Sequence, residues 1–190
     1  MAHPPLDLAG LFREHSRGLA GAVRGVLGAR ADVQEVLQEA FLKAWRALDG
    51  GSQPVDPTAW VFVLTMNLAR DQLRRERRRG PHHELNEVDE VRLQAREPEP
   101  AQRIEGREAV AAARNAIHTL ADAEKEVFLL RASGDLSFAA VADALGIPVG
   151  TAKSRMRAAL RNLRDRLADH APDAHPLRLT ADAEIEGDAR

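Results

Sequence analysis

Residues 56–79 read DPTAWVFVLTMNLARDQLRRERRR, and this stretch decides how the rest of the chain is interpreted. Asp56 is a good N-cap and Pro57 suits the first helical position, where no N–H donor is needed, so the stretch is predicted to be a helix. Its apolar side chains cover most of the circumference, which indicates a helix wedged between others with one polar strip left open. The strip carries Trp60, Asn67, Asp71, Arg74 and Arg78.

The polar strip ends in a basic patch in which arginines far outnumber the acids. The patch consists of Arg70, Arg74, Arg75, Arg77, Arg78 and Arg79, against Asp71 and Glu76. An arginine side chain can donate hydrogen bonds to two phosphate oxygens at once, and a tryptophan ring can stack on an unpaired base. The strip therefore favours a contact with nucleic acid. Taken alone, the segment agrees equally well with a solvated arginine run on a helix whose tryptophan belongs to the core.

Composition limits the classes of protein to consider. The chain has 190 residues, 44% of them hydrophobic and 29% charged, which suffices for one domain or two small ones with a buried core. Because there is no cysteine, a disulfide scaffold, a thiol nucleophile and a cysteine-type zinc finger are excluded, and a reducing cytoplasm is compatible. No signal peptide and no membrane insertion are expected, since no stretch approaches the roughly 20 apolar residues of a membrane span.

The net charge of −2 conceals an uneven distribution of charge. The basic run at residues 70–79 is followed by an acidic segment, and a second basic cluster at residues 153–166 gives way to an acidic tail from Asp169 onward. Two basic patches separated by acidic connectors are typical of a two-point contact with nucleic acid.

Two more helices are predicted before residue 56. The first runs from about Asp7 to Leu27 and is closed by Gly28. Glycines at positions 18, 21 and 25 weaken it by about 1 kcal/mol each, or instead let a neighbouring helix approach closely. The second helix starts at a capping-box-like pair, Asp32 and Glu35, and continues to residue 48 as an amphipathic helix.

The amphipathic helix at residues 33–48 has one apolar stripe, which includes Trp45. Its exposed carboxylates suit a protein partner, although a merely solvated polar face is the commoner case. A glycine-rich loop at residues 49–55 then leads into the helix at 56–79. Three packed helices around one core therefore complete a first domain near residue 79.

Residues 80–108 are interpreted as a linker. They contain a Gly–Pro pair, many acids and two further prolines, Pro98 and Pro100. His82 and His83 lack further ligands in a metal-binding pattern, so they are interpreted as solvated loop residues, and no metal site is expected.

A second helical domain is predicted at residues 109–168. Helices are expected at 109–120, at 122–130, at 138–145 with Ser137 as N-cap, and from Pro148 to residue 167. A short helix, a turn at Gly146 and a longer helix with small polar and basic residues in its first turns are typical of a helix-turn-helix. The alternative is a purely structural helical hairpin. The expected apolar stripe of the long helix is Val149, Ala152, Met156, Leu160, Leu163 and Leu167.

With both halves considered, the chain resembles the extracytoplasmic-function (ECF) group of the sigma-70 family. DVQEVLQEAFLKAWRAL resembles conserved region 2.2, AWVFVLTMNLARDQLRRERRR resembles regions 2.3 and 2.4, and AEKEVFLLRASGDLSFAAVADALGIPVGTAKSRMRAALRNLRDRL resembles region 4. The implied fold is all-α, with two small helical domains joined by a flexible acidic linker. A region 2 domain of three to four helices would span residues 1–79, a linker 80–108, a helix-turn-helix region 4 domain 109–168 and an acidic tail 169–190.

The resemblance also implies a function. The chain would be a non-catalytic, cytoplasmic specificity subunit of RNA polymerase without a cofactor, and an anti-sigma factor would be an expected partner. Core polymerase would be bound through its β′ clamp helices by Asp32, Glu35, Gln38, Glu39 and Trp45. The loop at 49–55 and the helix after it would capture the unpaired non-template strand at the −10 element through Trp60, Asn67, Arg70, Arg74, Arg75, Arg77 and Arg78. The −35 duplex would be read by Thr151, Lys153, Ser154, Arg155, Arg157 and Arg161.

Two other classes of protein are considered. A helix-turn-helix transcriptional regulator acting without core polymerase would carry a ligand or phosphoacceptor domain in front, but the N-terminal helices show no strand–helix alternation. An enzyme is not predicted, because the chain has no glycine-rich phosphate loop, no paired-carboxylate motif and no nucleophile–base pattern.

Overall fold

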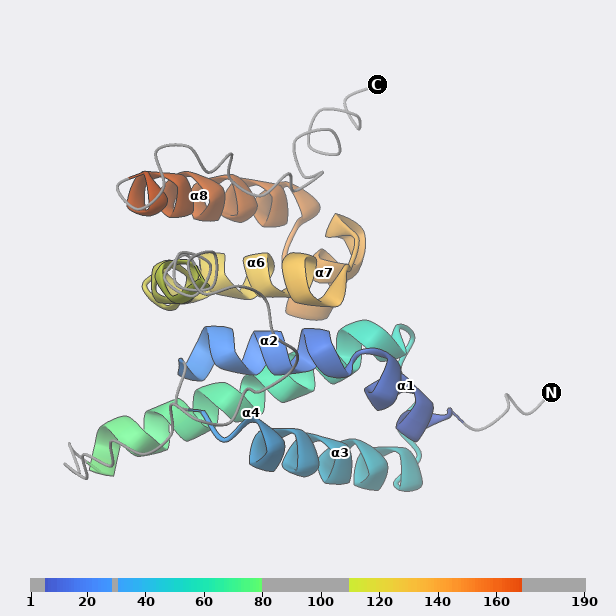
Figure 1. The fold of residues 1–190 in the computed structure, drawn as a ribbon. Coiled ribbons are helices and arrows are strands. Elements are labelled where there is room, and N and C mark those ends of the chain that lie inside the picture. Colours follow the sequence, from blue (N-terminus) through green and yellow to red (C-terminus); the bar gives the residue numbers. More distant parts are fainter. Residues whose placement is uncertain (1–5, 29–30, 80–109, 169–190) are drawn as a thin grey trace, which may run out of the picture.

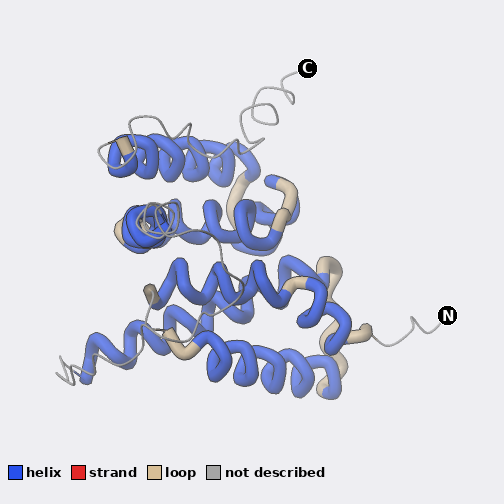
Figure 2. Tube along the Cα trace, viewed as in Figure 1, coloured by secondary structure: helices blue, strands red, loops and turns tan. Residues whose placement is uncertain are grey.

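The computed structural model describes residues 6–28, 31–79 and 110–168. These residues form helices and connecting loops, with no strand among them, so the all-α prediction is confirmed (Figures 1 and 2). The predicted linker and acidic tail, together with His82 and His83, lie outside the described residues.

The N-terminal unit consists of α1 (Leu8–Glu14), α2 (Ser16–Leu27), α3 (Val33–Asp49) and α4 (Pro57–Arg79). α2 packs against α4 and α3, and α3 packs against α4, so α4 lies between other helices as its apolar circumference predicts. The centre of the packing is fully buried and consists of Leu19, Val23, Val36, Val61, Phe62 and Met66.

The prediction of one helix from Asp7 to Leu27 was wrong, because the helix breaks at His15. The backbone of His15 has φ −95° and ψ 10°, and its ring packs edge-on against Phe62 with centroids 5.9 Å apart. The break turns α1 toward α3, where Phe12 and Phe41 make a second edge-on pair at 5.3 Å (Figure 1). The helical spacing of apolar residues continues through the break, so the sequence pattern concealed it.

The predicted starts of three helices are confirmed by hydrogen bonds from backbone N–H groups to the side chains of the capping residues. The Asp32 carboxylate accepts from the backbone N–H groups of Gln34 and Glu35, at 3.1 and 3.0 Å. The Asp56 carboxylate accepts from the N–H of residue 59 at 2.8 Å. The Ser137 hydroxyl accepts from the N–H of residue 140 at 3.1 Å. These caps satisfy donors that the first turn of a helix otherwise leaves unpaired.

The C-terminal unit contains a helical stretch at residues 110–118, then α6 (Asp122–Gly134), α7 (Phe138–Leu145) and α8 (Val149–Leu167). α6 continues four residues beyond the predicted end at 130, and Asp135 follows it with φ 51°. Gly146 has φ 63°, a conformation that favours glycine, and makes the predicted turn between α7 and α8.

Two details of α8 correct the sequence prediction. Pro148 is the N-cap residue with extended backbone angles, so it precedes the helix instead of opening it. Val149 was expected in the buried stripe but is 38% exposed, as Pro148 and Gly150 on either side of it are also exposed. Further along, Ala152, Met156 and Leu163 are buried as predicted.

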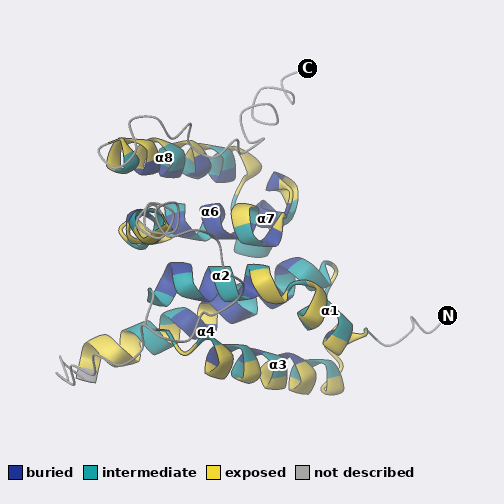
Figure 3. Cartoon of the chain, in the orientation of Figure 1, coloured by how far each residue is buried: buried dark blue, intermediate teal, exposed yellow. Residues whose placement is uncertain are grey.

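The two units pack against one another. α6 contacts both α2 and α4, and α7 also contacts α4. The facing sides of α2 and α6 are largely buried, whereas the outer side of α3 and the C-terminal end of α4 are exposed (Figure 3). One hydrophobic cluster therefore runs through both units. No pattern in the sequence predicted that these two domains would touch.

Candidate nucleic-acid and polymerase interfaces

The predicted single-strand contact residues all lie on α4. Trp60 and Arg70 are half-buried, whereas the others are exposed. Arg78 lies eighteen positions after Trp60, which at a rise of 1.5 Å per residue places them about 27 Å apart along the helix axis. The C-terminal end of α4 projects beyond the rest of the N-terminal unit (Figures 1 and 3). The exposed members are Asn67, Arg74, Arg75, Arg77 and Arg78.

Hydrogen bonds hold several of these side chains along α4. Arg70 donates to the Asn67 side-chain oxygen at 2.6 Å, and Arg74 lies 3.3 Å from the Asp71 carboxylate. The Nε of Arg75 donates to the backbone carbonyl of Asp71 at 3.3 Å. Arg70 differs from the rest, because its guanidinium also pairs with Glu126 of α6, in the other unit.

The predicted duplex contact residues lie on α8, from its third residue, Thr151, to its thirteenth, Arg161. Ser154, Arg157 and Arg161 are exposed, and the Ser154 hydroxyl donates to the carbonyl of Thr151 at 2.9 Å. The remaining members, Thr151, Lys153 and Arg155, are half-buried. The opposite side of α8 packs on α6 and α7, so α8 presents a polar, positively charged face beside the turn that follows α7.

The five residues predicted to contact a protein partner have different roles in α3. The Asp32 carboxylate is occupied as N-cap, and Glu39 lies 3.4 Å from Lys43 in an exposed pair. Glu35 and Gln38 are exposed. Trp45, expected within the apolar stripe, is 54% exposed and so lies at the edge of the stripe on the surface.

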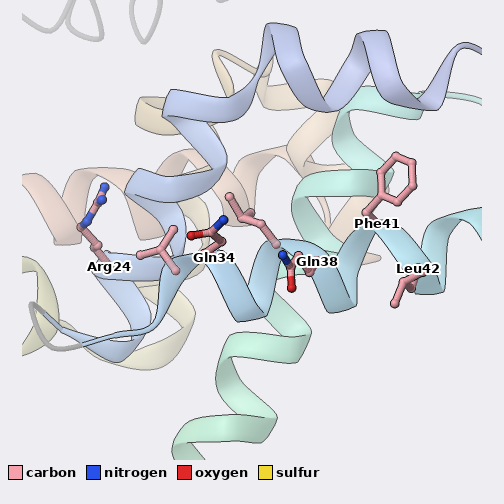
Figure 4. Close-up of a pocket in the computed structure, with 7 residues that line it drawn as sticks. Arg24, Gln34, Gln38, Phe41 and Leu42 are labelled. Carbon is pink, nitrogen blue, oxygen red and sulfur yellow. The ribbon is translucent and has the colours of Figure 1, made fainter.

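An apolar groove between α2 and α3 escaped the sequence analysis. It has a volume of about 670 Å³ and runs beside Gln38 (Figure 4). Leu42, which is 49% exposed, stands at one end of it. The sequence offered one sign of this groove: Leu42 falls outside the apolar stripe of α3, so an apolar side chain on the surface could have been expected there. The groove is lined by Arg24, Val33, Gln34, Leu37, Gln38, Phe41 and Leu42.

Two titratable groups near the contact between the units have lowered pKa values. Burial is the main cause for Lys125, which is 7% exposed and donates from Nζ to the carbonyl of His118 at 2.7 Å. Burial also lowers the pKa of the His118 ring, and the charges of Lys125 and Arg77 act in the same direction. Within residues 6–28, 31–79 and 110–168, no cluster of three or more histidines and carboxylates has the arrangement of a metal site.

Comparison with known proteins identifies the family. Residues 11–79 match Sigma-70 region 2, and residues 116–165 match Sigma-70, region 4. The RNA polymerase sigma factor CnrH of Cupriavidus metallidurans is 30% identical over 150 residues, which cover 77% of this chain and 78% of CnrH. The ECF RNA polymerase sigma-E factor of Haemophilus influenzae is 27% identical over 133 residues, covering 67% of this chain and 70% of the relative. The chain belongs to the ECF group of the sigma-70 family.

Solved structures agree with this assignment. The structure of CnrH in complex with the cytosolic domain of CnrY matches this sigma factor with a TM-score of 0.59 at 27% identity, covering 85% of this chain and 88% of CnrH. The sigma factor RpoE of Bartonella quintana, solved with the anti-sigma factor NepR, has the same fold with a TM-score of 0.63 at 22% identity, covering 85% and 96%.

Membership of the family gives the protein's activity. It is an RNA polymerase sigma factor, which binds core polymerase and promoter DNA to start transcription. The region 2 match includes all of α3 and α4, and the region 4 match includes α6, α7 and the first 17 residues of α8, up to residue 165. No helix among the described residues has the length and apolar character needed to cross a membrane.

Proposed function

We propose that this sigma factor divides promoter recognition between α4 and α8 and binds core polymerase through α3. α4 captures the unpaired non-template strand at the −10 element, and α8 reads the −35 duplex. The observation that carries the proposal is the distribution of exposed arginines, which gather on one helix of region 2 and on one helix of region 4. Two separate cationic helices suit two separate stretches of DNA.

At the −10 element, Trp60 supplies a stacking surface and the arginines neutralise phosphates. A base that leaves the duplex loses a few kcal/mol of stacking energy. Stacking on an aromatic side chain and contacts between arginines and phosphates offset this loss. The half-buried position of Trp60 supports this role, because the surrounding helix fixes the ring while one part of it stays accessible. Asn67 and Arg74 continue the same strip toward the basic end of α4.

At the −35 element, the first turns of α8 enter the major groove. Thr151 and Ser154 are small, so they allow the helix to approach base edges closely, while Arg157 and Arg161 reach phosphates. Lys153 and Arg155 flank this face and contribute further positive charge.

The proposed polymerase contact combines the polar face of α3 with its exposed apolar residues. Leu42 and Trp45 are the anchors, because large apolar side chains that become buried on binding dominate the energy of protein interfaces. Gln38 and Glu35 surround them, and the β′ clamp helices are the proposed partner. Asp32 contributes indirectly, since its carboxylate already stabilises the start of α3.

We further propose a protein regulator and a cellular setting. RpoE of Bartonella quintana was solved with an anti-sigma factor, and an anti-sigma protein is proposed for this chain by analogy. The protein acts in the cytoplasm, where core polymerase and promoters are found, and performs no catalysis of its own.

The test is run-off transcription from a genomic promoter pool, using purified bacterial core polymerase with and without this protein. New transcripts that require the protein are expected, and their start sites reveal the −10 and −35 elements together. DNA binding without core polymerase and without any new start site would contradict the proposal and favour an ordinary helix-turn-helix regulator.

A further inference from the structure

A small cavity lies between the second half of α4 and the first two turns of α6. Its volume is about 50 Å³. One water molecule needs about 10–15 Å³ on the same measure, so the cavity has room for about four groups of water size, or for the four oxygen atoms of one phosphate. Four cationic side chains and two carboxylates line it. They are Arg70, Arg74 and Arg77 of α4 and Lys125, Asp122 and Glu126 of α6.

The two carboxylates do not neutralise the four cations of the cavity. Glu126 is occupied by an ion pair with Arg70, in which both side chains are largely buried. The Asp122 side chain is 86% exposed, and its carboxylate lies 4.0 Å from Nζ of Lys125. Arg77 makes no ion pair with any residue that the structure describes. Four cations against two carboxylates leave the cavity with an excess of two positive charges.

Lys125 is a buried cation without a close counter-charge. It is 7% exposed, and its ammonium group donates one hydrogen bond, to the carbonyl of His118 at 2.7 Å. An ammonium group has three donors, so two remain, and among the described residues none accepts from them. Burial lowers the pKa of Lys125, Asp122 offsets this only in part, and Arg77 adds to it. An anion in the cavity would supply the charge and the acceptors that this side chain lacks.

Two arginines of α4 line the cavity together with Lys125. Arg74 and Arg77 are three residues apart, so they lie on the same face of the helix. Each guanidinium can donate two hydrogen bonds to one phosphate group. The contact of Arg74 with Asp71 is exposed to water, at 67% and 56% of the two side chains, so it is weak and can be exchanged for a contact with a ligand.

We propose that this cavity is a binding site for one phosphate group, held by Arg74 and Arg77 of region 2 and Lys125 of region 4. The excess of two positive charges matches the charge of a phosphate dianion. Because the cavity admits a single phosphate, the ligand is either inorganic phosphate or a nucleotide whose terminal phosphate enters the cavity while the remainder lies outside. The proposal goes beyond promoter recognition and does not depend on it.

Titration of the full chain with inorganic phosphate tests the site. Calorimetry at constant ionic strength, with sodium chloride replaced by sodium phosphate, should show saturable binding at one site. The Tm should also rise with phosphate and not with chloride, because a ligand that binds the folded chain alone stabilises it. Absence of saturable binding at millimolar phosphate would overturn the proposal.

Two arginine variants separate the cavity from the general positive charge of α4. Arg77 and Arg78 are both exposed, but only Arg77 lines the cavity. Arg77→Gln should weaken phosphate binding at least threefold, as expected for loss of a partly exposed charged hydrogen bond, and Arg78→Gln should leave it nearly unchanged. Equal weakening in the two variants would show an adventitious ion only, attracted by the basic end of the helix.

A third variant tests the buried cation. Lys125→Gln removes the charge but keeps a donor for the carbonyl of His118, and it should weaken phosphate binding at least tenfold. Unchanged affinity in a folded Lys125→Gln protein would overturn the proposal. Should this variant fail to fold, the comparison of Arg77→Gln with Arg78→Gln decides.

Competition distinguishes the two sources of the phosphate group. Adenosine 5′-monophosphate is added to the protein loaded with inorganic phosphate. Displacement at a lower concentration than phosphate itself requires would assign the site to the terminal phosphate of a nucleotide, and failure to displace would assign it to inorganic phosphate.

Discussion

Replacing Arg74 and Arg78 by alanine tests the role of α4 in capturing single-stranded DNA. Arg74 and its partner Asp71 are 67% and 56% exposed in their side chains, so their ion pair contributes at most about 0.5 kcal/mol to the free energy of unfolding. Arg78 is exposed at the projecting end of α4. The double variant should therefore fold with nearly unchanged stability and bind core polymerase normally.

The expected loss is in the electrostatic part of DNA binding. Each single-strand phosphate contact contributes about 0.7 to the slope of log affinity against log salt concentration, so two contacts contribute about 1.4. Between 50 and 200 mM salt, the ratio of wild-type to variant affinity should then fall by about sevenfold. Open complexes should form more slowly at low salt, where the two contacts contribute most.

The assay is binding of the core–sigma complex to a fork-junction DNA that contains the −10 element but lacks the −35 duplex, measured over a series of salt concentrations. A variant with Arg164→Ala and Arg166→Ala removes the same charge from exposed positions of region 4 and serves as the control. An unchanged salt slope in the α4 variant would refute the phosphate contacts. Loss of core binding in that variant would show that α4 serves the polymerase interface instead.

Three further predictions concern single residues. Trp60→Ala should slow promoter melting, because it removes about 1–3 kcal/mol of base stacking, whereas Trp60→Phe should retain most of the rate. Melting can be followed with a fluorescent base in the −10 element. A normal melting rate in the alanine variant would assign Trp60 to the core alone. Arg157→Ala should weaken protection of the −35 duplex in footprinting, and unchanged protection would exclude that contact. Burial, and then the charges of Lys125 and Arg77, lower the pKa of His118 below its ordinary value of about 6.5. The unfolded chain therefore binds the proton more readily, and stability falls as the pH drops below about 6.5. The wild-type Tm should therefore decrease from pH 7.5 to 5.5 more than that of His118→Gln, and equal decreases would exclude this group as the cause.

Local patterns predicted most of the helices because the determinants are themselves local. Asp32, Asp56 and Ser137 bond N–H groups only two or three residues away, so their caps can be recognised from the sequence alone. The turn at Gly146 is similarly local, since it depends on a backbone angle that glycine readily adopts.

The features that escaped prediction depend on contacts between distant parts of the chain. His15 breaks a continuous helical pattern where its ring meets Phe62, 47 positions further along. The pairing of Arg70 with Glu126 joins residues 56 positions apart, and no charge pattern selects that partner among the many acids. The groove beside Leu42 exists only because α2 lies next to α3. The glycines of α2 were predicted either to weaken the helix or to let a neighbouring helix approach closely. The structure confirms the close approach, because a Cβ atom at Gly18 or Gly25 would clash with α6.

Gly18, Gly21 and Gly25 leave the backbone of α2 bare where α6 packs against it, and this affects the order in which the protein folds during its synthesis. Three glycines cost α2 about 3 kcal/mol of helix propensity, so packing must maintain the helix. Its partner α6 is completed only at Gly134, more than a hundred residues after Gly25. At about 5–20 residues per second, the ribosome exposes α2 roughly 5–20 seconds before α6 is available to cover it. Once α4 has also been made, nascent region 2 presents Phe62 and the bare α2 backbone to chaperones or to core polymerase, before its own C-terminal half can compete.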